Sequence, residues 1–85
     1  MRVEILLPEV GAAPLALSSW FADLGDTVYE GDRVVEILAG GATFDVAAPA
    51  TGRLVEQRAF FDDRLVPGQV LGAVEADETR AGAAG

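Results

Sequence analysis

The chain of 85 residues is long enough for one small domain, and 51% of its residues are hydrophobic, which is enough for a core. It contains neither histidine nor cysteine, which removes most transition-metal sites, thiol nucleophiles and imidazole bases. Fourteen acidic residues against six basic ones give a net charge of −8, which argues against a nucleic-acid or anionic-membrane surface.

The N-terminal segment predicts a strand followed by a loop. Arg2 to Leu7 alternates between polar and apolar residues before it turns apolar, and Pro8 ends it because proline cannot donate a ladder hydrogen bond. Glu9 to Pro14 is rich in glycine, alanine and proline and is typical of a loop.

Leu15 to Phe21 fits two structures. As a strand it places Leu15 and Leu17 on one face and lets Trp20 cover an edge of the core. As a helix, Leu17, Trp20, Phe21 and Leu24 have helical spacing. We favour the strand because about seven residues between turn signals is short for a helix.

Two glycine turns precede the central part of the chain, one at Asp23 to Val28 and one at Tyr29 to Asp32. A strand is then expected over Arg33 to Leu38, with Val35 and Ile37 on one face.

Gly40 and Gly41 join this strand to a returning one. A Gly-Gly pair suits a two-residue hairpin turn of type I′ because both residues can take positive φ without steric cost. In the returning strand, one face is expected to carry Phe44, Val46 and Ala48, and the other Thr43 and Asp45. Pro49 to Gly52 breaks that strand.

The last strands follow at short intervals. They are expected at Arg53 to Gln57 and Gln69 to Glu75, with turns at Phe60 to Asp63 and Val66 to Gly68 between them. Residues 76–85 are rich in alanine and glycine and predict a disordered tail or the start of a linker. The sequence therefore predicts an all-β domain over residues 1–75.

A shift of 37 positions aligns two halves of the chain. Turn residues and apolar residues coincide, and Gly25 falls on an aspartate, which tolerates a left-handed backbone. The matched pairs are Ala22 and Ala59, Gly25 and Asp62, Asp26 and Asp63, Val28 and Leu65, Gly31 and Gly68, Val34 and Leu71, Ile37 and Val74. Two interleaved four-strand halves would form a flattened β-barrel.

Five segments in order resemble the lipoyl/biotinyl carrier domains, above all the lipoyl domains of acyltransferase components of 2-oxo acid dehydrogenase complexes. They are Leu7 to Gly11, Trp20 to Val28, Val34 to Ile37, Val46 to Gly52, and Pro67 to Glu75. The resemblance covers residues 4–75 and implies a barrel-sandwich hybrid. One departure is that the segment between Gly11 and Trp20 is about two residues shorter than in those domains.

The departure that matters most lies at the hairpin tip. The family attaches its cofactor to the lysine of an Asp-Lys turn flanked by acidic residues, and the resemblance aligns Gly40 with the aspartate and Gly41 with the lysine. Lipoate and biotin are both attached as amides to a lysine amine, and this sequence contains no lysine. We therefore expect no lipoate and no biotin here, and no catalytic or metal-binding residue.

Four interpretations of function remain open. The first is a degenerate carrier domain that acts as a structural or docking module beside dehydrogenase or acyltransferase subunits. The second is a module that binds a small ligand or protein at the hairpin or between the halves. The third is an enzyme that uses Asp62 and Asp63, which are expected to be turn residues instead. The fourth is a segment of a larger acyltransferase.

The cellular location and the oligomeric state are predicted only from general features of the sequence. No run approaches the ~20 apolar residues of a membrane span, and no basic segment precedes an apolar one as in a signal peptide. We expect a cytoplasmic monomer without membrane or nucleic-acid partners. The excess of acidic residues fits a solvated surface that keeps a small domain soluble, or a docking surface for basic partners.

Overall fold

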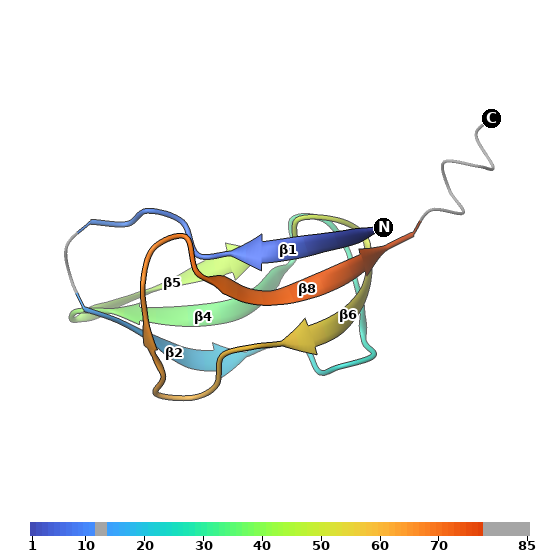
Figure 1. Ribbon diagram of the computed structural model, residues 1–85. Helices are drawn as coiled ribbons and strands as arrows, with labels where there is room; N and C mark the ends of the chain where they lie inside the picture. The colour runs from blue at the N-terminus through green and yellow to red at the C-terminus, as the bar shows by residue number, and fades with distance from the viewer. Residues whose placement is uncertain (12–13, 78–85) are drawn as a thin grey trace.

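The computed structural model describes residues 1–11 and 14–77, which form eight β-strands (Figure 1). Since these residues include no helix, none of them forms a helix that could cross a membrane. The strands are β1 (Arg2–Leu6), β2 (Leu15–Trp20), β3 (Thr27–Val28), β4 (Arg33–Ala39), β5 (Ala42–Ala47), β6 (Gly52–Gln57), β7 (Arg64–Leu65) and β8 (Val70–Ala76).

The strands form two antiparallel four-stranded sheets that face each other (Figure 1). Their orders are β1-β8-β6-β3 and β5-β4-β2-β7, so each sheet takes strands from both halves of the chain. The predicted flattened, all-β barrel-sandwich hybrid of two interleaved halves is confirmed.

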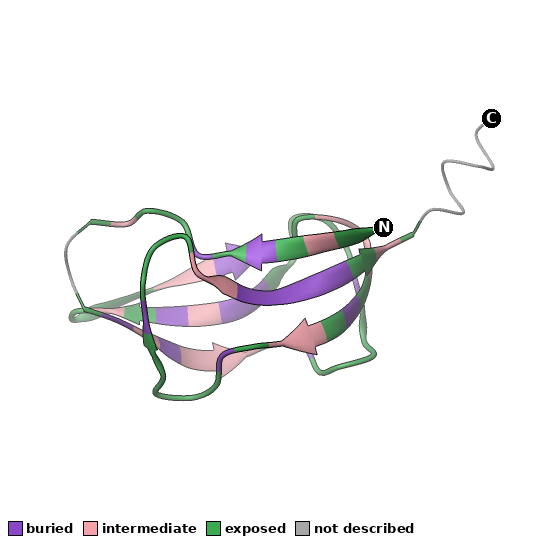
Figure 2. Ribbon diagram, in the orientation of Figure 1, coloured by how far each residue is buried: buried purple, intermediate pink, exposed green. Residues whose placement is uncertain are grey.

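The core lies between the sheets. Figure 2 shows buried stretches along the strands and exposed loops at both ends of the sandwich. Among the described residues no polar or charged residue is buried, so the interior is held by apolar contact. The largest fully buried side chains are Ile5, Leu7, Leu17, Val34, Val35, Ile37, Leu54, Leu71 and Val74.

The ambiguous segment at Leu15 to Phe21 is a strand, as predicted. Leu15 and Leu17 are buried, and Trp20 packs against the core while its indole N–H donates to the carbonyl of Ala59 at 2.9 Å. A helix would have left Ala16 without its partners in β4 and β7. At the other end of the chain, β8 extends to Ala76, and the predicted tail lies mostly outside the described residues.

The predicted internal repeat is confirmed in the backbone. Gly31 and Gly68 have φ of 93° and 84°. Gly25 has φ of 94°, and its counterpart Asp62 has φ of 71°, the one positive φ among the described residues other than glycine. Every apolar pair in the alignment is buried in both halves.

The side-chain hydrogen bonds that close the turns also repeat at the offset of 37 residues. Asp26 accepts a bond from the amide of Asp23 at 2.8 Å, and Asp63 accepts the equivalent bond from Phe60 at 2.8 Å. The strands β2 and β6 have register shifts at equivalent places, after Leu17 and Leu54. Because turns, strand irregularities and buried positions all coincide, the two halves are related by pseudo-twofold symmetry.

This symmetry predicts matched mutational effects. Asp26→Ala and Asp63→Ala should each lower the free energy of unfolding by about 1 kcal/mol, because each loses one hydrogen bond that closes a turn. Chemical denaturation of both variants measures this, with Asp26→Asn and Asp63→Asn as controls that keep an acceptor. A cost confined to one half would contradict equivalent turns.

Candidate functional site

The tip of the β4–β5 hairpin is the candidate site, because it corresponds to the position where a carrier lysine would be expected. Ala39 pairs with Ala42, so Gly40 and Gly41 form a two-residue turn as predicted. The amide of Gly40 donates to the carbonyl of Pro14 at 3.2 Å. This bond holds the tip against the start of β2.

The turn itself differs from the expected one. Gly40 has φ of 63°, but Gly41 has no positive φ. The prediction that both glycines use the left-handed region is therefore wrong for Gly41, and the signs of φ match a type II′ turn instead of type I′. A Cβ atom on Gly41 would meet no other atom within 4 Å. The position that aligns with the carrier lysine is thus free to hold a side chain, although this chain has none there.

The two glycines should respond differently to mutation. Gly40→Val should lower the free energy of unfolding by about 1 to 2 kcal/mol, because its left-handed φ is costly for a β-branched residue. Gly41→Val is the matched control and should change stability little, since its φ and its surroundings are permissive. Thermal unfolding of both variants provides the comparison, and equal costs would contradict the turn geometry.

A shallow hollow of about 370 Å³ lies beside the tip. Ala16 lies between Leu38 and Arg64 in one cross-strand row, and its small side chain leaves the space between them open. The hollow is lined by Pro14, Leu15, Ala16, Leu38, Gly40, Asp62 and Arg64. No local sequence signal marks this hollow, because it combines residues from three separate strands.

The acidic pair considered for catalysis has a structural role. The carboxylate of Asp63 closes the 60–63 turn, and Asp62 supplies its left-handed residue. In the described part of the chain, no three side chains of metal-ligating types gather into a possible metal site. The two residues at the hairpin tip are both glycine, so the tip presents backbone for contact.

Two pseudo-symmetric halves that bury one core and expose a tight hairpin at one end form a fold that this chain shares with a solved lipoyl domain. The structure matches the lipoyl domain of the 2-oxoglutarate dehydrogenase complex from Azotobacter vinelandii, with a TM-score of 0.66 over 89% of this chain and 98% of that one. Sequence identity is 21%, so this match concerns the fold. No model of a known protein family matches the chain.

The relatives by sequence are acyltransferase components. The chain is 33% identical over 78 residues to the dihydrolipoyllysine-residue succinyltransferase component of the 2-oxoglutarate dehydrogenase complex of Bartonella vinsonii subsp. berkhoffii, and the match covers 89% of this chain and 19% of the relative. It is 32% identical over 76 residues to the same component of Haemophilus influenzae, and this match covers 87% of this chain and 19% of the relative. It is 28% identical over 84 residues to the dihydrolipoyllysine-residue acetyltransferase component of the pyruvate dehydrogenase complex of Corynebacterium glutamicum. This match covers 95% of this chain and 12% of the relative.

The resemblance drawn from the sequence is therefore confirmed. The chain spans about a fifth or less of the length of these relatives, so the match concerns one part of each.

Proposed function

We propose that this domain carries no lipoyl or biotinyl group and acts as a structural or docking module of a 2-oxo acid dehydrogenase type of assembly. The observation that carries the proposal is the hairpin tip: the sequence contains no lysine, and the residue that the resemblance aligns with the acceptor lysine is Gly41. The relatives are parts of dehydrogenase complexes, which supports partners among dehydrogenase or acyltransferase subunits. The domain itself has no catalytic role in this proposal.

The chemistry of attachment supports the absence of a cofactor. Lipoylation and biotinylation need a lysine amine as nucleophile, and the six basic residues of this sequence are all arginines. The guanidinium of arginine stays protonated and cannot replace that amine. The fold has nevertheless kept a packed core and a well-formed hairpin. A surface that a partner recognises would explain why.

Intact-mass spectrometry tests the first half of the proposal. The protein is incubated with a lipoate ligase, lipoate and ATP, and separately with a biotin ligase and biotin. We expect the mass of the unmodified polypeptide in both reactions. A lipoyl domain that contains its lysine is the positive control, and a lipoyl or biotinyl adduct on this chain would contradict the proposal.

A ligand-binding module is the second candidate, and the hollow beside the hairpin favours it. The hollow joins the apolar side chain of Leu38 to the guanidinium of Arg64, a combination suited to a small molecule with an apolar part and a carboxylate. Protein-observed NMR with a set of short-chain carboxylic acids tests it. Saturable shifts confined to Leu38, Gly40 and their neighbours would support this candidate, and their absence would remove it.

A further inference from the structure

Two of the segments that cross from one sheet to the other place four large apolar side chains in solvent. The first crossover, residues 21–26, connects β2 to β3, and the second, residues 58–63, connects β6 to β7. Phe21 and Leu24 are 50% and 58% exposed, and Phe60 and Phe61 are 55% and 78% exposed. Figure 1 shows both crossovers on the lower side of the sandwich, away from β1 and β5.

Hydrogen bonds hold the two crossovers together. The indole of Trp20 donates to the carbonyl of Ala59 at 2.9 Å, and the side-chain amide of Gln57 donates to the carbonyl of Ala22 at 3.0 Å. These two bonds are equivalent under the 37-residue offset. The backbone at Phe21 and at Phe60, which lies next to these two bonds, is therefore close in space.

The pseudo-symmetry shows that the fold does not require these apolar residues. Phe60 occupies the position that Asp23 holds in the other half, and Phe21 occupies the position of Arg58. The backbone amides bond in the same way at each pair. Those of Asp23 and Phe60 donate to the carboxylates that close their turns, and those of Phe21 and Arg58 donate to the carbonyls of Val34 and Leu71, all at 2.8 Å. A polar residue is thus compatible with each position, and the exposed aromatic rings call for an explanation outside the fold.

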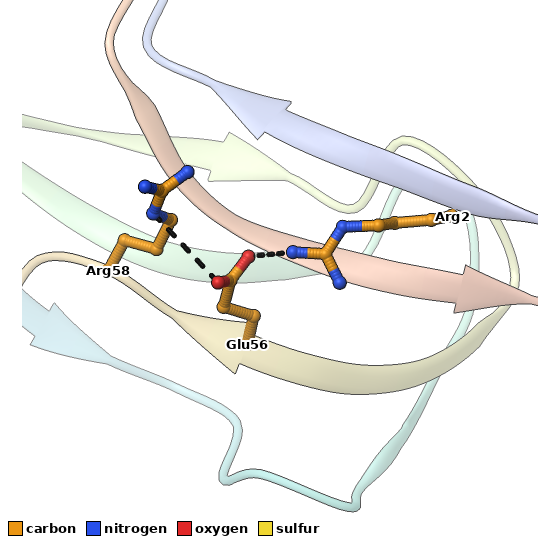
Figure 3. Close-up of polar contacts among 3 residues, drawn as sticks. All are labelled: Arg2, Glu56 and Arg58. Carbon is orange, nitrogen blue, oxygen red and sulfur yellow. Dashed lines mark hydrogen bonds and ion pairs between the residues drawn. The ribbon is translucent and has the colours of Figure 1, made fainter.

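The surface is also acidic. The two crossovers carry four aspartates against one arginine. That arginine, Arg58, lies 3.9 Å from the carboxylate of Glu56, which also pairs with Arg2 from the other side of β8 (Figure 3). Its charge is therefore directed toward the outer face of the β1-β8-β6-β3 sheet and not toward the aspartates. A second copy of the chain would bring like charges together, which disfavours self-association through this surface.

We propose that the crossover surface, formed by Phe21, Asp23, Leu24, Phe60, Phe61 and Asp62, docks a basic amphipathic segment of another subunit. Apolar side chains of that segment would cover the aromatic rings, and its lysines or arginines would pair with the aspartates. This inference rests on the proposed function, because the partner is sought among the subunits of the dehydrogenase assembly. Of the residues in this docking site, Asp62 also lines the hollow beside the hairpin tip.

The test measures binding of the intact protein to the purified dehydrogenase and acyltransferase components of its own cell, by biolayer interferometry. Phe60→Ser combined with Phe61→Ser should weaken binding to one component at least tenfold. Leu6→Ser combined with Val66→Ser is the control, since both side chains are exposed but lie on β1 and in the turn after β7. The control should bind within about twofold of the wild type, and thermal unfolding shows that each variant is folded.

A charge variant completes the test. Asp23→Asn combined with Asp62→Asn should weaken binding and reduce its dependence on salt, and asparagine tolerates the left-handed backbone at position 62. Wild-type affinity in the Phe60 and Phe61 variant would overturn this docking site while the proposed function stood. Failure of the wild type to bind any component would overturn both.

Discussion

Replacing Gly52 by alanine should lower the free energy of unfolding by about 2 to 3 kcal/mol, the usual cost of forcing extra volume into a packed site. Gly52 begins β6 and lies opposite Ala76 of β8. A Cβ atom there would collide with the backbone carbonyl of Glu75, which cannot move without disturbing the β6–β8 ladder. For a domain of this size the loss corresponds to a decrease of roughly 10 to 20 °C in Tm.

Gly41→Ala is the matched control for this prediction, because its Cβ would meet nothing within 4 Å and its φ is not left-handed. Scanning calorimetry of the two variants gives the comparison. If Gly52→Ala melted like the wild type, the close approach of β6 and β8 would be contradicted.

Gly41→Lys should fold as well as the wild type and still be a poor substrate for a lipoate ligase. Because Gly41 has no positive φ, a lysine at this position brings no left-handed backbone strain. Recognition should still fail because Gly40 imposes its own turn geometry and Ala39 and Ala42 are not acidic. We expect modification at least about a hundredfold slower than that of a lysine-containing lipoyl domain, since small misplacements of a reacting group have effects of that order.

The measurement is the rate of mass increase under identical ligase concentrations. Retention of stability is checked by the midpoint of thermal unfolding. Lipoylation of Gly41→Lys at a rate near that of the control domain would show that this hairpin lacks only its lysine, and that its shape is that of an active carrier.

Local sequence signals predicted most of the fold. Glycine and aspartate mark the turns in both halves, so Gly25, Asp62 and the 37-residue repeat could be identified before any coordinates were known. Alternating apolar residues fixed the buried faces of β4 and β5, where Ile37 and Val46 enter the core. These features depend on near neighbours along the chain, which a sequence displays directly.

The features that were missed depend on tertiary contacts. Two adjacent glycines fit a type I′ or a type II′ turn equally well, so the sequence does not reveal the φ of Gly41, nor the bond from the amide of Gly40 to Pro14. The crossover surface forms because Trp20 and Gln57 each reach a backbone carbonyl of the other half. Neither bond has a sequence signature, so Phe21 and Phe60 were not recognised as parts of one surface.

The central claim is that this domain has the fold of a carrier domain, lacks the lysine that would hold a cofactor, and docks to a subunit of a dehydrogenase assembly. It is tested most directly by native mass spectrometry of the protein isolated by affinity from its own cell. The account predicts an unmodified polypeptide bound to a subunit of a 2-oxo acid dehydrogenase complex. A chain that bears a lipoyl or biotinyl group, or that is isolated without any such subunit, would contradict it.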